Sequence, residues 1–165
     1  MPVMTEINAE AQRVHEAALW ASECQYANCK IWRTAGSIIS VAAAVAAGVA
    51  GVAGLADLIT VQWAGGIAIA SAAIGAVNSS LGAARIAADS TVAGNQYRNL
   101  QQDARVFRNI ELRALADSEA REELHQLISR QQELNVSAPV PSGLARWMAK
   151  RNIKRGGQDY EVDAT

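Results

Sequence analysis

Charged residues are almost absent from the middle of this 165-residue chain, where Asp57 is the only one between Arg33 and Arg85. The uncharged stretches on its two sides, residues 34–56 and 58–84, are each longer than the roughly 20 residues with which a helix crosses a hydrocarbon core. Backbone polar groups in lipid must be satisfied within the segment, so we expect both stretches to be transmembrane helices. The link between them is too short to hold a domain, which predicts a hairpin.

Cysteine and histidine are also scarce, with two of each in the chain. Cys24 and Cys29 are five residues apart and lie on different sides of a helix, and His15 and His125 are isolated, so none of them has metal-ligand spacing. No paired acid and base suited to catalysis is evident either. We therefore expect no metal, no cofactor and no enzymatic activity.

The basic residues predict an orientation in the membrane. Of the fifteen Lys and Arg, three precede the predicted hairpin and the other twelve follow it. By the positive-inside rule, both termini should face the cytoplasm. We expect an all-α protein with four parts: an N-terminal cytoplasmic helix (1–33), the transmembrane hairpin (34–84, loop 57–63), a cytoplasmic continuation and helical bundle (85–136), and a proline-containing connector with a basic segment (137–165).

The cytoplasmic part has the pattern of a small helical bundle. No turn signal follows Arg85 for some distance, so we expect the second membrane helix to continue past it, with Gly94 as the only candidate break. Asp117 marks a helix restart. Three faces with helical spacing are apolar and could pack together. They consist of Tyr97, Leu100, Ala104 and Phe107; of Leu124, Leu127, Ile128 and Leu134; and of Val14, Ala18 and Ala21.

Small residues fill much of the predicted membrane helices. Those at helical spacing are Gly36, Ser40, Ala44 and Gly48 in one row, Gly51 in a neighbouring row, and Gly75 in the second helix. Small residues let helix backbones approach closely in lipid. These rows could simply join the two helices of one hairpin. Because there are more of them than one hairpin contact requires, we also expect packing between protomers.

Polar residues in the second stretch share one helical stripe. Ser71, Asn78 and Arg85 are seven residues apart, and Gly82 lies on the same side. Polar side chains in a bilayer usually face the interior of a bundle or a water-filled path. The stripe therefore predicts one wall of a pore assembled from several copies. The alternative is a set of hydrogen bonds across a dry interface between helices.

A basic segment follows the two prolines, Pro139 and Pro141, which predict an extended connector. Its basic residues are Arg146, Lys150, Arg151, Lys154 and Arg155. An amphipathic helix of this kind could lie on anionic lipid, bind a phosphate-bearing ligand or cap the bundle. We do not expect nucleic acid as a partner, because the chain is slightly acidic overall and carries no base-reading motif.

The order of these features resembles the SLATT family, bacterial two-transmembrane effector domains associated with nucleotidyltransferases and nucleotide sensors. The resemblance is carried by the hairpin and by three motifs: Tyr97-x-x-Leu100-x-x-x-Ala104-x-x-Phe107, Ala138-Pro139-x-Pro141 and Gly157-x-x-Tyr160. It implies an effector of anti-phage or conflict defence that oligomerises, forms a pore in the bacterial inner membrane and stops growth. It also implies a separately encoded nucleotidyltransferase or sensor, or a cyclic nucleotide signal, as a partner.

Two other functions fit the same sequence features. A non-conducting membrane scaffold would display the cytoplasmic bundle to a partner and would need no wet polar stripe. A soluble helical oligomer could bury the alanine-rich stretches between its subunits and act as an interaction module.

Overall fold

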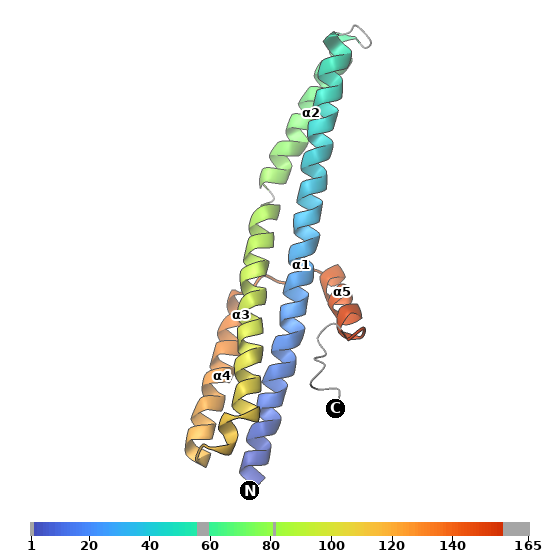
Figure 1. Ribbon diagram of the computed structural model, residues 1–165. Helices are drawn as coiled ribbons and strands as arrows, with labels where there is room; N and C mark the ends of the chain where they lie inside the picture. The colour runs from blue at the N-terminus through green and yellow to red at the C-terminus, as the bar shows by residue number, and fades with distance from the viewer. Residues whose placement is uncertain (1, 56–59, 81, 157–165) are drawn as a thin grey trace. The chain divides into compact units, whose positions relative to one another are not determined.

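The computed structural model describes residues 2–55, 60–80 and 82–156, and over these ranges its regular secondary structure consists of helices without strands (Figure 1). This confirms the all-α class. The elements in chain order are α1 (Pro2–Leu55), α2 (Val61–Ser80), α3 (Ala83–Asn109), a short 3-10 helix (Glu111–Arg113), α4 (Asp117–Ser137) and α5 (Gly143–Ile153). Residues 57–59 of the predicted loop lie outside the described residues, and residues 61–63, also assigned to the loop, belong to α2.

Packing divides the chain into two compact units. The hairpin unit is Lys30–Ala87, close to the predicted hairpin of residues 34–84, and the bundle unit combines Met1–Cys29 with Ala88–Thr165. The predicted boundary after residue 33 does not separate two helices, because α1 continues through it as one helix of 54 residues. No proline or glycine lies between residues 29 and 35, so nothing in the local sequence ends the helix there.

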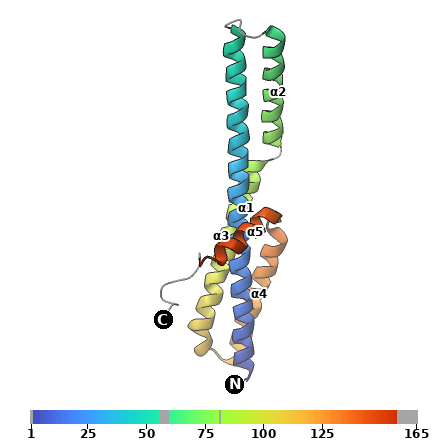
Figure 2. The same ribbon diagram turned by 90° about the vertical axis from the view of Figure 1, so that its right-hand side faces the viewer.

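The core of the bundle unit joins the three predicted apolar faces. Figure 1 shows α4 beside α3, and Figure 2 shows α4 beside α1. The core residues are Ile7, Ala11, Val14 and Ala18 of α1, Leu100, Ala104 and Phe107 of α3, and Ala120, Leu124 and Leu127 of α4. Their spacing of three and four places each set on one side of its helix. The predicted packing of the N-terminal helix against the bundle is therefore confirmed.

The predicted continuation of the second membrane helix past Arg85 is wrong. Helix α2 ends at Ser80, and α3 begins at Ala83 after Gly82, whose φ of 63° lies in the left-handed region that glycine adopts without strain. Gly94, the expected break, lies inside α3 instead. A Cβ on Gly94 would be 2.9 Å from the ring of Tyr26, so this glycine permits close helix packing.

The connector and α5 follow the sequence prediction. After α4 the chain is extended at Ala138, and the Ser142 hydroxyl caps α5 by accepting a hydrogen bond from the Ala145 N–H at 3.2 Å. The small side chains of Ala145 and Ala149 are buried, which places this face of α5 against the bundle unit. Figure 2 shows α5 lying obliquely across α1.

Truncation of Phe107 should destabilise the bundle unit strongly. Its side chain is 1% exposed, so Phe107→Ala should lower the free energy of unfolding by about 3–5 kcal/mol. The neighbouring Val106 is 39% exposed, and Val106→Ala should cost no more than about 1 kcal/mol. Thermal unfolding of both variants in the same detergent, followed by circular dichroism, measures the difference. Equal losses would show that Phe107 does not occupy the core.

Candidate membrane-facing surface

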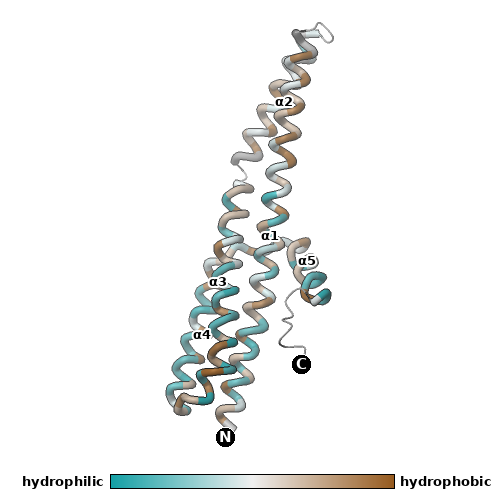
Figure 3. Tube along the Cα trace, viewed as in Figure 1, coloured by the Kyte–Doolittle hydropathy of each residue, from teal (hydrophilic) through white to brown (hydrophobic). Residues whose placement is uncertain are grey.

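The hairpin unit exposes a continuous apolar ridge on α1. The ridge consists of Ile38, Val41, Val45, Val49 and Val52, whose side chains are 59–68% exposed. On α2, Trp63 and Ile69 are also exposed. Figure 3 shows α2 and the adjacent part of α1 mostly in white and brown, the neutral and hydrophobic colours. Contiguous apolar surface of this kind mostly marks contact with lipid or with another protein.

One helical segment of the described residues has the length and composition needed to cross a membrane. This segment is Val3–Val52, and only 6% of its most apolar 18 residues is buried within the chain. The core helix of a soluble domain would have most of such a stretch buried. In α2 the apolar part is the shorter Gly65–Val77. These observations favour insertion of α1, and a second crossing stays a prediction.

The α1 side of the hairpin contact is not the row of small residues that the sequence suggested. Between residues 34 and 52 of α1, the buried and half-buried positions are Ala35, Gly36, Ile39, Ala43, Ala46 and Ala50. Of the predicted packing residues in α1, only Gly36 belongs to this stripe, and a Cβ there would lie 3.3 Å from that of Ala83. On α2, Gly75 is half-buried.

The remaining predicted packing residues lie on the outer surface of the hairpin unit. Ser40, Ala44, Gly48 and Gly51 are all exposed. A Cβ placed on Gly48 or Gly51 would meet no atom within 4 Å among the described residues. The hairpin contact therefore leaves Gly48 and Gly51 available for close approach by another helix.

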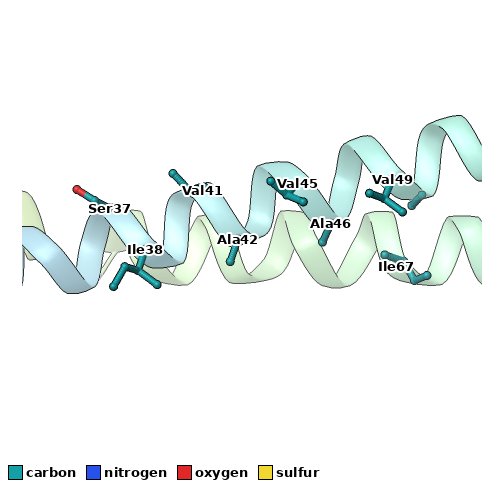
Figure 4. Close-up of a pocket in the computed structure, with 9 residues that line it drawn as sticks. Ser37, Ile38, Val41, Ala42, Val45, Ala46, Val49 and Ile67 are labelled. Carbon is teal, nitrogen blue, oxygen red and sulfur yellow. The ribbon is translucent and has the colours of Figure 1, made fainter.

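An apolar groove of about 860 Å³ lies along the same unit (Figure 4). It is lined by Ser37, Ile38, Val41, Ala42, Val45, Ala46, Val49 and Ala50 of α1 and by Ile67 of α2. Ser37 is the only polar residue among them, and its hydroxyl donates to the Arg33 carbonyl at 2.9 Å. The groove therefore suits an acyl chain or the apolar side chains of a helix.

The predicted polar stripe is not continuous. Ser71 is 6% exposed, and its hydroxyl donates to the Ile67 carbonyl of its own helix at 2.8 Å. The Asn78 side chain lies outside the described residues. Arg85 is exposed on α3, beyond the turn at Gly82, so it does not extend the stripe of α2. The inference of one uninterrupted stripe failed because it assumed a single helix through residue 85.

The structure places all five predicted ligand or lipid residues on the surface of the bundle unit. Arg146, Lys150 and Arg151 are exposed on α5, and Lys154 and Arg155 are exposed in the turn that follows. The Arg151 guanidinium lies 5.5 Å from the centre of the Trp147 ring.

The bundle unit contains a buried polar layer that was not predicted from the sequence. The Asn28 side-chain amide donates to the Ser90 hydroxyl at 3.0 Å, and its carbonyl oxygen accepts from the Ser142 N–H at 3.2 Å. Gln25 donates to the Pro139 carbonyl at 2.7 Å. Helical spacing could have predicted the burial of Gln25, because it lies seven residues after the buried Ala18, which in turn lies seven residues after the buried Ala11. These bonds fix the connector and α5 to α1.

A small cavity of about 260 Å³ lies beside this layer, and the buried Cys24 and the exposed Arg146 are among its lining residues. Burial raises the pKa of the Cys24 thiol to about 11, although the nearby Arg146 guanidinium acts in the opposite direction. In the part of the chain that the structure describes, no three His, Cys, Asp or Glu are grouped so as to hold a metal ion.

Comparisons with known proteins give no relative: no family model, curated protein or solved structure matches the chain.

Leucine substitutions at two glycines should separate packing within one hairpin from packing between copies. Gly48→Leu adds a side chain in open space, so the fold should persist while self-association weakens, because the larger side chain keeps helix backbones apart. Gly36→Leu should instead disturb the contact with Ala83 and lower thermal stability. Cross-linking in membranes and thermal unfolding in detergent measure the two effects. An unchanged oligomer ladder for Gly48→Leu would exclude this surface from the contact between copies.

Alkylation should distinguish the two cysteines. In Cys29→Ser only Cys24 remains, and maleimide should react slowly at neutral pH because the thiolate is the reactive form. The rate should rise about tenfold per pH unit towards pH 11, as the raised pKa requires. Denaturant should abolish this protection, and Cys24→Ser provides the matched control. Equal rates for folded and unfolded Cys29→Ser would contradict the burial of Cys24.

Proposed function

We propose that this chain is a non-enzymatic membrane effector of bacterial defence, whose hairpins assemble into a pore in the inner membrane. The single observation that carries the membrane location is the apolar ridge from Ile38 to Val52, which the chain itself leaves exposed. In lipid this surface needs no covering. The defence role rests on the resemblance to the SLATT family.

The dimensions of α2 support a second crossing. Its 20 residues span about 30 Å at a rise of 1.5 Å per residue, which equals the thickness of a typical hydrocarbon core. The helix carries no charged residue. Because residues 34–84 contain no Lys or Arg, both termini would be cytoplasmic.

Assembly would use the surfaces that one hairpin leaves open. Gly48 and Gly51 allow a second copy to approach α1 closely, and the apolar groove accepts side chains from its helix. The activating signal would be a cyclic nucleotide or a separately encoded nucleotidyltransferase or sensor acting on the cytoplasmic bundle.

A specific observation also favours a second candidate, the non-conducting scaffold. The Ser71 hydroxyl is satisfied by its own helix and is buried in the hairpin unit, so it does not require a water-filled path. In that case the hairpin anchors the bundle unit in the membrane without opening it.

Leakage from vesicles tests the pore directly. The purified chain, incorporated at a density high enough to assemble without its activating signal, should release a trapped dye from liposomes. Asn78→Leu should abolish the release without changing oligomer size, because apolar side chains favour dewetting of a constriction. Ser80→Leu, at the end of α2, is the matched control. Stable incorporation with no release by the parent protein would favour the scaffold. Recovery of the chain as a detergent-free soluble oligomer would exclude a membrane effector.

A further inference from the structure

Helix α5 presents an apolar strip that the rest of the described chain leaves uncovered. Its alanine face packs on the bundle unit, whereas Leu144 is 56% exposed and Trp147 is 57% exposed. Val140 in the connector is exposed as well. Leu144 and Trp147 are three residues apart in α5, so they lie on one side of this helix. An exposed Trp and Leu on one face of a short helix are typical of amphipathic helices that lie at the membrane–water interface.

The charged residues of α5 and of the turn that follows it are all basic. Arg146, Lys150, Arg151, Lys154 and Arg155 are all exposed, and residues 143–156 contain no Asp or Glu. The Arg151 guanidinium rests over the ring of Trp147, which keeps a cation at the edge of the apolar strip. An apolar strip bordered by cations complements a lipid surface with anionic headgroups.

The attachment of α5 holds this face in place. At its first end, the Ser142 N–H donates to the Asn28 side chain at 3.2 Å; at its last turn, Asn152 donates to the Glu23 carboxylate at 2.7 Å. Asn28 precedes Thr34, the first residue of the predicted membrane segment, by six positions in the sequence. The helix is thus tied to α1 shortly before the residues that would enter the membrane.

We propose that α5 docks on the surface of an anionic membrane, with Leu144 and Trp147 in the headgroup region and the five basic residues in contact with lipid phosphates. The inference rests on the membrane location of the proposed function. It adds a second, peripheral contact between the chain and lipid, whose strength depends on headgroup charge and on salt.

Tryptophan quenching by brominated lipid tests the docking in the full chain. The protein is incorporated into nanodiscs of phosphatidylcholine, with or without phosphatidylglycerol, in which acyl chains are brominated close to the headgroup. The fluorescence difference between the parent and Trp147→Phe isolates Trp147. This difference should be strongly quenched in discs with phosphatidylglycerol, should recover in about 1 M NaCl, and should be lost in Lys150→Glu/Lys154→Glu. The corresponding difference for Trp20→Phe, in the bundle unit, should not be quenched.

The outcomes separate the two proposals. Normal incorporation with no effect of phosphatidylglycerol on Trp147 would overturn the docking and leave the membrane location intact. Failure to incorporate into either disc would overturn the membrane location itself. Quenching that is equal in the neutral and anionic discs and insensitive to salt would also contradict the docking, because the five cations would then contribute nothing to it.

Discussion

One constraint dominates the structure: the hairpin unit carries apolar side chains whose exposure to water is unfavourable, and the described part of the chain does not bury them. The ridge residues Ile38 to Val52 are exposed, and the contact between α1 and α2 uses mainly alanine and glycine. Small side chains bury little apolar area, so this contact alone gives a weak hydrophobic stabilisation in water. In lipid the same side chains permit close packing and the ridge is solvated by acyl chains.

The bundle unit, in contrast, buries large apolar side chains within the chain. Its large apolar side chains, such as Leu100 and Phe107, are buried between three helices, and its exposed residues are mostly polar. The Asn28 side chain, which is buried, bonds both Ser90 and Ser142. A buried amide with both of its ends paired fixes the relative positions of α1, α3 and the start of α5, because breaking either bond would leave an unsatisfied polar group.

The sequence correctly predicted those elements in which apolar residues recur at helical spacing on one side only. The faces around Leu100 and Leu124 are apolar on one side and charged on the other, so their helical spacing identifies the buried side, and Pro139 and Pro141 mark a connector. The buried side of α1 in the hairpin unit was not predictable in this way. Ala, Gly and Val occur all around that part of the helix, so only the position of α2 decides which residues are covered.

The structural roles of two glycines, one in α3 and one in the turn before it, could not be predicted from the sequence either. Gly82 and Gly94 are equally isolated in sequence, yet Gly82 adopts a positive φ and ends a helix while Gly94 accommodates the Tyr26 ring. The choice depends on the tertiary neighbour and not on the local sequence. The predicted continuity of the polar stripe failed at this point, because Arg85 follows the turn and no longer shares a helix with Ser71.

A spin label at Ile69 tests the membrane location most directly. Ile69 lies near the middle of α2, is highly exposed and is not part of the apolar groove. In the Ile69→Cys variant without Cys24 and Cys29, the label should collide frequently with dioxygen, which dissolves in hydrocarbon, and rarely with a water-soluble nickel chelate. Frequent collision with the chelate would place α2 in water, and rare collision with both reagents would place it inside a protein interior. Either result would contradict a hairpin in lipid.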